Sequence, residues 1–215
     1  PAAFKDHFHG KISGYNFMVA KISDYDIDKG SQHNLDTIFE IMKEQKVEKW
    51  FEKWVEIFVF DTLIGDTDRH QDNWGIMYMY RSNKKILSPA FDNGTSMGYE
   101  ILDKNLYKFN HENYMKNYIQ RGYHHIKLSL NQQKHVKHLD LIRELFRRNK
   151  KVSKEVISRI IEFDVKDVEN ILNYLVQFKV EYTLKEERAE FMLKLLLKRK
   201  EYLILIILLE FVFLF

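Results

Sequence analysis

Proline is almost absent from this chain, and its scarcity constrains the fold more than any other sequence feature. The 215 residues include only two prolines, Pro1 and Pro89, and eight glycines. Proline breaks helices because it lacks the amide hydrogen and its ring clashes with the preceding turn, and glycine weakens them through its backbone entropy. A chain with so few of both can form long helices. We therefore expect a mainly α-helical fold, in one domain of good size or two small ones.

Apolar residues recur with helical spacing along much of the chain. The pattern from Leu35 to about Lys46 predicts one helix. Residues 47–63 predict a second helix, and its apolar side chains spread around so much of the surface that we expect it to be buried. Asp164 with Asp167 is typical of a helix start, and Thr183 with Glu186 has the form of a capping box that opens a C-terminal helix.

One segment departs from the helical pattern. "WGIMYMY" and "ILSPAF" read as two strands, and "RSNKK" between them reads as a turn, which predicts a β-hairpin over residues 74–91. The expected fold class is therefore mainly α with a small β-hairpin.

Charge is distributed unevenly along the chain. The formal net charge is +3, but residues 104–159 hold 14 Lys and Arg against 4 Asp and Glu, with five histidines besides. A basic stretch of this kind is either a solvated helical surface or a surface that meets phosphate or an acidic protein. It contains no interleaved aromatic and basic motif of a nucleic-acid module, so we expect no direct nucleic-acid binding.

The C-terminal sequence "YLILIILLEFVFLF" is strongly apolar. Its apolar run before Glu210 is shorter than the roughly 20 residues that a membrane-spanning helix needs, so a C-terminal core helix is the first interpretation. Membrane association and a non-native extension are the alternatives. We divide the chain into residues 1–200 and an apolar tail, residues 201–215. The absence of cysteine and of an N-terminal signal peptide fits the cytoplasm.

The polar loop "IGDTDRHQDNWGI", residues 64–76, carries the residues best suited to chemistry. Phosphoryl transfer from ATP needs metal ions on the phosphates and a carboxylate that accepts the proton of the attacking hydroxyl. Asp68 lies five residues before Asn73, which is the D-x-x-x-x-N spacing of a kinase catalytic loop, and Asp92 follows in "LSPAFDNGTSMG". Oxygen ligands of this kind suit Mg²⁺. The alternative is a loop that is simply solvated.

These two blocks together resemble the HipA-like serine/threonine kinases. The D-R-H-x-x-N core is also shared with phosphatidylinositol 3- and 4-kinases, but "SPAFDNG" favours the HipA-like group. The motifs cover residues 61–98, and the predicted helices fit a HipA-like C-lobe from about residue 20 to residue 200. The resemblance implies a kinase that uses ATP and Mg²⁺ to phosphorylate a protein.

The resemblance also assigns roles to single residues. Asp68 would be the catalytic base, and Asn73 and Asp92 would bind ATP through Mg²⁺. Arg69 and His70 match the family motif and would hold the loop in shape, with His70 near the phosphate as a second candidate catalytic residue.

Other residues near the motifs have structural interpretations. Asp66 and Asp72 are expected to stabilise turns through local backbone hydrogen bonds. Gly94 and Gly98 are expected to relieve strain in the backbone conformation rather than to bind phosphate. The pair His124 and His125 is expected to make substrate or structural contacts, without a catalytic role.

A kinase N-lobe is not evident in the sequence. No G-x-G-x-x-G is present, and only 67 residues precede Asp68. The segment "MVAKIS" is similar to the strand that carries the phosphate-binding lysine of kinases, which would be Lys21, but too few residues precede it. We interpret it as a hinge after an absent N-lobe.

Three functions therefore remain open. The first is a HipA-like protein kinase with a protein substrate; by resemblance it could be the toxin of a toxin–antitoxin pair, with an antitoxin or an N-lobe-bearing partner. The second is a kinase-fold remnant that acts as a non-catalytic binding module. The third is a phosphatidylinositol-type lipid kinase.

Overall fold

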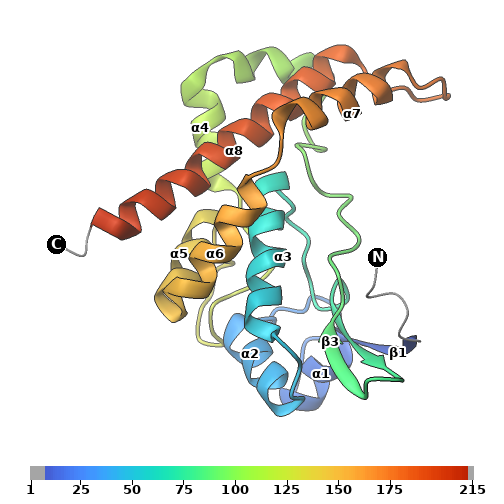
Figure 1. Cartoon of the computed structure of the whole chain (residues 1–215), viewed down its shortest axis with the longest axis vertical. Coiled ribbons are helices and arrows are strands. Elements are labelled where there is room, and N and C mark those ends of the chain that lie inside the picture. The colour runs from blue at the N-terminus through green and yellow to red at the C-terminus, as the bar shows by residue number, and fades with distance from the viewer. Residues whose placement is uncertain (1–7, 213–215) are drawn as a thin grey trace.

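The computed structural model describes residues 8–212, which form a mainly helical body with one small antiparallel sheet (Figure 1). This arrangement confirms the expected fold class. The strands are β1 (Phe8–Ser13), β2 (Gly75–Met79) and β3 (Lys84–Leu87). The helices are α1 (Gly14–Lys21), α2 (Leu35–Glu44), α3 (Trp50–Ile64), the 3-10 helix η2 (Asp103–Asn110), α4 (Glu112–Arg121), α5 (His138–Arg148), α6 (Lys150–Ile161), α7 (Val165–Gln177) and α8 (Glu186–Val212).

Helix α3 is the central helix of the fold. It packs against α5, α6 and α8, and it also contacts α2 and β3. Trp54, Val55, Phe58 and Val59 have no exposed surface, which confirms that this helix is buried. The helix begins at Trp50 rather than near residue 47, because Lys49 adopts a left-handed conformation with φ of 47°. A second, smaller core joins η2 and α4 to the first half of α8.

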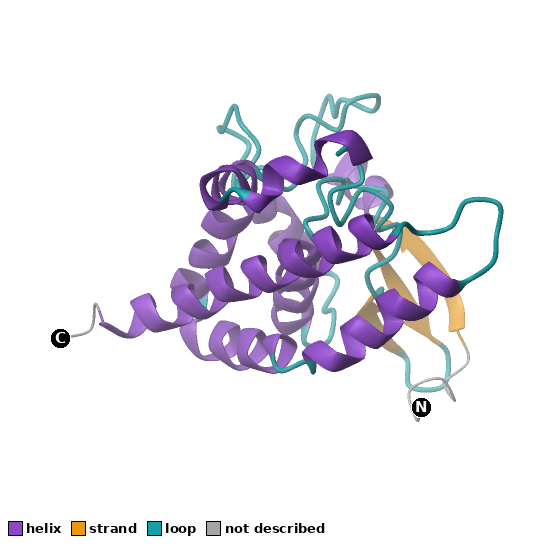
Figure 2. Cartoon of the chain, turned by 90° about the horizontal axis from the view of Figure 1, so that it is seen from above, coloured by secondary structure: helices purple, strands orange, loops and turns teal. Residues whose placement is uncertain are grey.

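The sheet lies at one edge of the helical body (Figure 2). Strands β2 and β3 pair antiparallel, which confirms the hairpin, but β3 covers Lys84–Leu87 rather than the predicted residues 86–91. Strand β1 pairs antiparallel with the other side of β2, with an irregular register between Phe8 and Gly10. This third strand was not predicted, because "FHGKIS" is short and carries no alternating apolar pattern.

The segment that resembles a kinase strand is helical. Residues 14–21 form α1, which packs against α2. Lys21 lies at the last turn of α1 and forms ion pairs with Glu40 and Glu44 of α2. The side chain of Lys21 is therefore engaged with α2, and the segment is not the strand that its sequence suggests.

Helix α8 includes most of the apolar tail. The helix runs without a break from Glu186 to Val212, and Leu203 and Ile206 are buried, as expected for a core helix. Its other face is exposed at Leu205 and Leu208. Within residues 8–212, no helix is long and apolar enough to cross a membrane. The last three residues of the predicted tail lie outside the described residues.

Candidate functional site

The polar loop begins where α3 ends, and a glycine makes this end possible. Gly65 adopts a left-handed conformation with φ of 74°, and its amide donates to the carbonyl of Asp61 at 2.7 Å. A Cβ at Gly65 would lie 2.7 Å from the guanidinium of Arg199, which is buried behind the loop. Glycine therefore satisfies both the backbone conformation and the close approach of Arg199.

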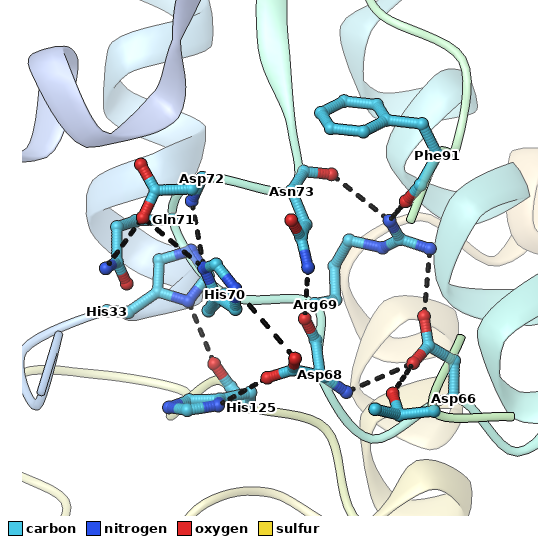
Figure 3. A network of polar contacts seen from close by, with 11 residues as sticks. His33, Asp66, Asp68, Arg69, His70, Gln71, Asp72, Asn73, Phe91 and His125 are labelled. Atoms are coloured by element: carbon cyan, nitrogen blue, oxygen red, sulfur yellow. Dashed lines mark hydrogen bonds and ion pairs between the residues drawn. The ribbon is translucent and has the colours of Figure 1, made fainter. Parts of the chain in front are cut away.

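Arg69 organises the loop (Figure 3). Its guanidinium donates to both carboxylate oxygens of Asp61 at 3.0 and 2.7 Å, and to the carboxylate of Asp66 at 3.1 Å. It also donates to the carbonyl oxygens of Asn73 and Phe91 and to the side-chain oxygen of Asn93. One buried side chain thus ties the end of α3, the loop and the segment after β3 together. The prediction that Arg69 holds the loop in shape is confirmed.

Arg69 pairs with two carboxylates inside the core. Asp61, Asp66 and Arg69 are each at most 1% exposed. Burial raises the pKa of Asp61 to about 6, although its bonds to Arg69 act in the opposite direction. Burial also acts to lower the pKa of Arg69, but the hydrogen bonds and charges of Asp61 and Asp66 outweigh it, so the pKa is raised and the guanidinium stays charged. Removal of one partner would leave an uncompensated buried charge.

Asp66 has a larger role than the predicted turn. Its carboxylate accepts the backbone N–H of Asp68 at 3.1 Å, which confirms the expected local bond. It also pairs with Arg69 and accepts the hydroxyl of Thr95 at 2.6 Å. Asp66 therefore joins the loop to the segment after β3 as well.

Asp68 combines a fixed backbone with a carboxylate that faces solvent. Its N–H is held by Asp66, and its carbonyl oxygen accepts from the side-chain amide of Asn73 at 2.7 Å. Its side chain remains 42% exposed, and its carboxylate oxygens lie 3.3 Å from Nδ1 of His125 and 3.9 Å from Nε2 of His70. This is the geometry expected of a carboxylate that meets a substrate while its position is fixed.

The two predicted magnesium ligands border the same network. The amide nitrogen of Asn73 donates to Asp68, and among the described residues its side-chain oxygen accepts no hydrogen bond. Asp92 is exposed, with φ of 54°, and it lies between Phe91 and Asn93, which both accept from Arg69. Arg69 thus draws the segments of Asn73 and Asp92 towards each other.

The residues present suit Mg²⁺ with a phosphate ligand rather than a self-contained metal site. Residues 8–212 contain no group of three or more His, Cys, Asp or Glu side chains that could hold a metal ion. Mg²⁺ is usually held by one or two carboxylates together with substrate phosphates and water. One carboxylate at Asp92 and one amide oxygen at Asn73 are consistent with that pattern.

His70 flanks Asp68, as its place in the motif suggests. Its Nδ1 accepts the backbone N–H of Asp72 at 3.2 Å, and its ring meets that of His125 at 6.0 Å between centroids. Asp72 differs from its predicted role. Its exposed carboxylate accepts from the side chains of Ser13 and Gln71 and lies 3.5 Å from Nδ1 of His70, and within residues 8–212 no local backbone group donates to it.

The two glycines near Asp92 have different environments. Gly98 has φ of 71°, and a Cβ there would lie 2.7 Å from the ring of Phe191, so the expected backbone role is confirmed. Gly94 has no positive φ and open space around it, so neither strain nor crowding explains a glycine at that position.

Two buried histidines support the segment that carries His125 and the polar loop. The ring of His33 donates through Nδ1 to the carbonyl of His125 at 2.9 Å and accepts from the indole of Trp74 at 3.1 Å. His138 donates through Nε2 to the carbonyl of Asp66 at 2.9 Å. Burial lowers the pKa of both rings to about 3, so both are neutral at pH 7. The histidines therefore serve as neutral hydrogen-bonding supports for the loop.

Sequence reasoning missed several members of this site. A single aspartate inside the apolar run "FVFDTLIG" is a signal that could have identified Asp61, because a charge in a buried helix needs a partner. No sequence signal connects His125 with Asp68, since 57 residues separate them.

Comparison with known proteins relates this arrangement to a kinase. No known protein-family profile matches the chain. In sequence it is similar to the serine/threonine-protein kinase CtkA of Helicobacter pylori strain J99, with 31% identity over 101 residues. The aligned segment covers 44% of this chain and 30% of that protein, so it spans less than a third of the kinase.

The structural similarity extends over nearly the whole chain. The crystal structure of the Helicobacter pylori proinflammatory kinase CtkA matches with a TM-score of 0.70 and 18% sequence identity. The match covers 95% of this chain and 72% of that structure. The chain therefore has a kinase-like fold, as expected for a kinase C-lobe, and its sequence is related to that of a serine/threonine kinase.

Proposed function

We propose that this chain carries the catalytic loop of a serine/threonine protein kinase that uses ATP and Mg²⁺. The observation that carries the proposal is the contrast within one short loop: the backbone of Asp68 is fixed by Asp66 and Asn73, while its carboxylate is half-exposed. A carboxylate held in this way suits a base that must meet an incoming hydroxyl.

The reaction assigns a task to each side chain. The carboxylate of Asp68 accepts the proton of a Ser or Thr hydroxyl as its oxygen attacks the γ-phosphorus of ATP. The bond between this phosphorus and the oxygen that bridges the β- and γ-phosphates breaks, and ADP leaves. Asn73 and Asp92 would hold Mg²⁺, which neutralises charge on the phosphates when bound. Arg69 holds these segments in place from inside the core.

Two isosteric substitutions separate proton acceptance from metal binding. Asp68→Asn removes the proton acceptor and should lower phosphate transfer from labelled ATP by at least about 10²-fold, with little change in nucleotide affinity. Asp92→Asn removes the anionic metal ligand, so it should weaken Mg²⁺-dependent ATP binding as well as turnover, and excess Mg²⁺ should partly restore both. The assays use the protein as its gene encodes it.

Asp28→Asn is the matched control, because Asp28 is an exposed aspartate outside the loop without an assigned role in transfer. It should retain full activity. Small and equal losses from Asp68→Asn and Asp92→Asn would overturn the proposal in favour of a non-catalytic binding module. Transfer to phosphoinositide vesicles but to no protein would show a lipid kinase instead.

A further inference from the structure

An open pocket lies beside the candidate catalytic loop, between the end of α4 and the start of α5. Its volume is about 360 Å³, and it is lined by Arg121, Tyr123, Gln133, Lys134, His135 and Lys137. Three of these six residues are cationic and none is acidic. A pocket of this size and charge suits a carboxylate or a phosphate group on a larger ligand.

Among the described residues, the cations of this pocket have no ion-pair partner. Arg121, Lys134 and Lys137 are exposed, and none forms an ion pair within residues 8–212. The arginines of α5 and α6 differ, since Arg143, Arg148 and Arg159 all pair with carboxylates. The charge of the pocket is therefore available to a ligand, whereas these three arginines are already paired.

The electrostatic environment of His135 agrees with this reading. Its pKa is lowered by burial and by the nearby charges of His125 and Lys127. Burial is the largest of these causes, and the charges of His125 and Lys127 add to it in the direction that favours an anion.

One histidine connects the pocket with Asp68. The ring of His135 lies 4.7 Å from that of His125 and stacks on Tyr123 at 5.8 Å, between centroids. His125 in turn places Nδ1 3.3 Å from the Asp68 carboxylate. The backbone bridge between Tyr123 and Lys137 holds the two sides of the pocket together. The pocket and the candidate base are thus neighbours across a single side chain.

We propose that this pocket binds an acidic or phosphorylated residue of the acceptor protein, close in sequence to the Ser or Thr that meets Asp68. The assignment rests on the proposed kinase function. The path from Asp68 across His125 to His135 corresponds to roughly two or three residues of extended peptide, at about 3.3–3.6 Å per residue. The kinase would then select acceptor sites that carry negative charge two or three residues away.

Matched peptides test this proposal by binding and by turnover. The peptides contain one Ser and carry Glu, phosphoserine or Ala two or three residues away on either side. Fluorescence anisotropy with labelled peptides should give at least about five-fold tighter binding for the Glu or phosphoserine peptide than for the Ala peptide, and a similar ratio in kcat/KM. Comparison of the Glu and phosphoserine peptides decides which of the two anions is preferred.

In the double variant Lys134→Ala/Lys137→Ala, the ratio of affinities for the acidic and the Ala peptides should fall close to one. The control Lys104→Ala/Lys116→Ala removes the same charge from exposed positions outside the pocket, and it should keep the ratio. Equal binding of acidic and neutral peptides would overturn the proposal, as would equal losses in the two double variants. Tighter binding of a single-stranded oligonucleotide, lost in Lys134→Ala/Lys137→Ala, would assign the pocket to nucleic acid instead.

The binding and turnover measurements test the anion pocket and the kinase function separately. Selective binding of acidic peptides without phosphate transfer to any peptide would contradict the kinase function but support the anion pocket. Phosphate transfer at the same rate to acidic and neutral peptides would contradict the anion pocket but support the kinase function.

Discussion

Within one loop, Asp66 and Asp68 are two residues apart and occupy opposite environments. Asp66 is buried with Asp61 and Arg69, and its carboxylate accepts from Asp68, Arg69 and Thr95. The carboxylate of Asp68 is 42% exposed, and its side-chain partners in the described part of the chain are histidines. The charges of the buried half of the loop pair with one another and hold the fold. The backbone is thereby fixed, and the carboxylate of the exposed half faces solvent.

The same contrast appears among the histidines. His33 and His138 are buried, and both ring nitrogens of each have hydrogen-bond partners. His70 and His125 are 27% and 29% exposed and flank Asp68. The two halves should therefore respond differently to substitution: stability should depend on the buried half and activity on the exposed half.

Loss of Arg69 should have the largest effect on stability. Arg69→Met keeps most of the side-chain volume but leaves the buried carboxylates of Asp61 and Asp66 without their cation. We expect the free energy of unfolding to fall by about 3–5 kcal/mol, because a buried charge is left unpaired. Urea denaturation measures the change. Arg147→Met, at an exposed salt bridge of α5, is the control and should cost less than about 1 kcal/mol. Similar costs for both would break the comparison.

Acidification should destabilise the protein through its buried histidines. Burial lowers the pKa of His33 and of His138 to about 3 from 6.5. The unfolded chain therefore binds these protons first, and the free energy of unfolding falls as pH drops from 6.5 towards 3. The loss is about 1.4 kcal/mol per pH unit for each histidine.

Asp61 acts in the opposite direction. Burial raises its pKa to about 6 from 3.8, so the folded state gains a proton first below pH 6. Two histidines against one aspartate give a net loss of about 1.4 kcal/mol per pH unit between pH 6 and pH 4. Urea denaturation at pH 7.5, 6, 5 and 4 measures the combined effect of these three groups on the free energy of unfolding. A constant or rising stability on acidification would show that the buried rings are not held neutral.

An isosteric pair provides the smallest and sharpest test. Asp66→Asn removes a charge and one acceptor function from the buried network, so we expect a loss of about 1–3 kcal/mol in the free energy of unfolding. Asp68→Asn makes the same chemical replacement at a half-exposed carboxylate. It should lower the free energy of unfolding by less than about 0.5 kcal/mol. Thermal or urea denaturation compares the two. A larger cost at Asp68 would place it among the residues that hold the fold.

The regular elements were largely predictable from the sequence. The helical periodicity located α2 and α3, and the alternation in "WGIMYMY" and "ILSPAF" located the hairpin. Asp164 marked the start of α7, where its side chain accepts from the amide of Lys166. These features depend on local chemistry, so neighbouring residues suffice to indicate them. The boundary of α3 and strand β1 were missed because a turn at Lys49 and pairing with β2 decide them.

The candidate site divides along the same line. The sequence by itself determined that polar residues gather in the loop of residues 64–76, and the spacing of Asp68, Asn73 and Asp92 is the basis of the proposed phosphoryl transfer. Only the tertiary structure decided which aspartate is buried and which faces solvent, since neighbours in one loop differ by their distant partners. Arg69 reaches Asp61 and Asn93, and His125 reaches Asp68, across intervals that no local pattern encodes. The physical reason is that burial and charge pairing act through space, whereas a sequence pattern reports only on residues that are close along the chain.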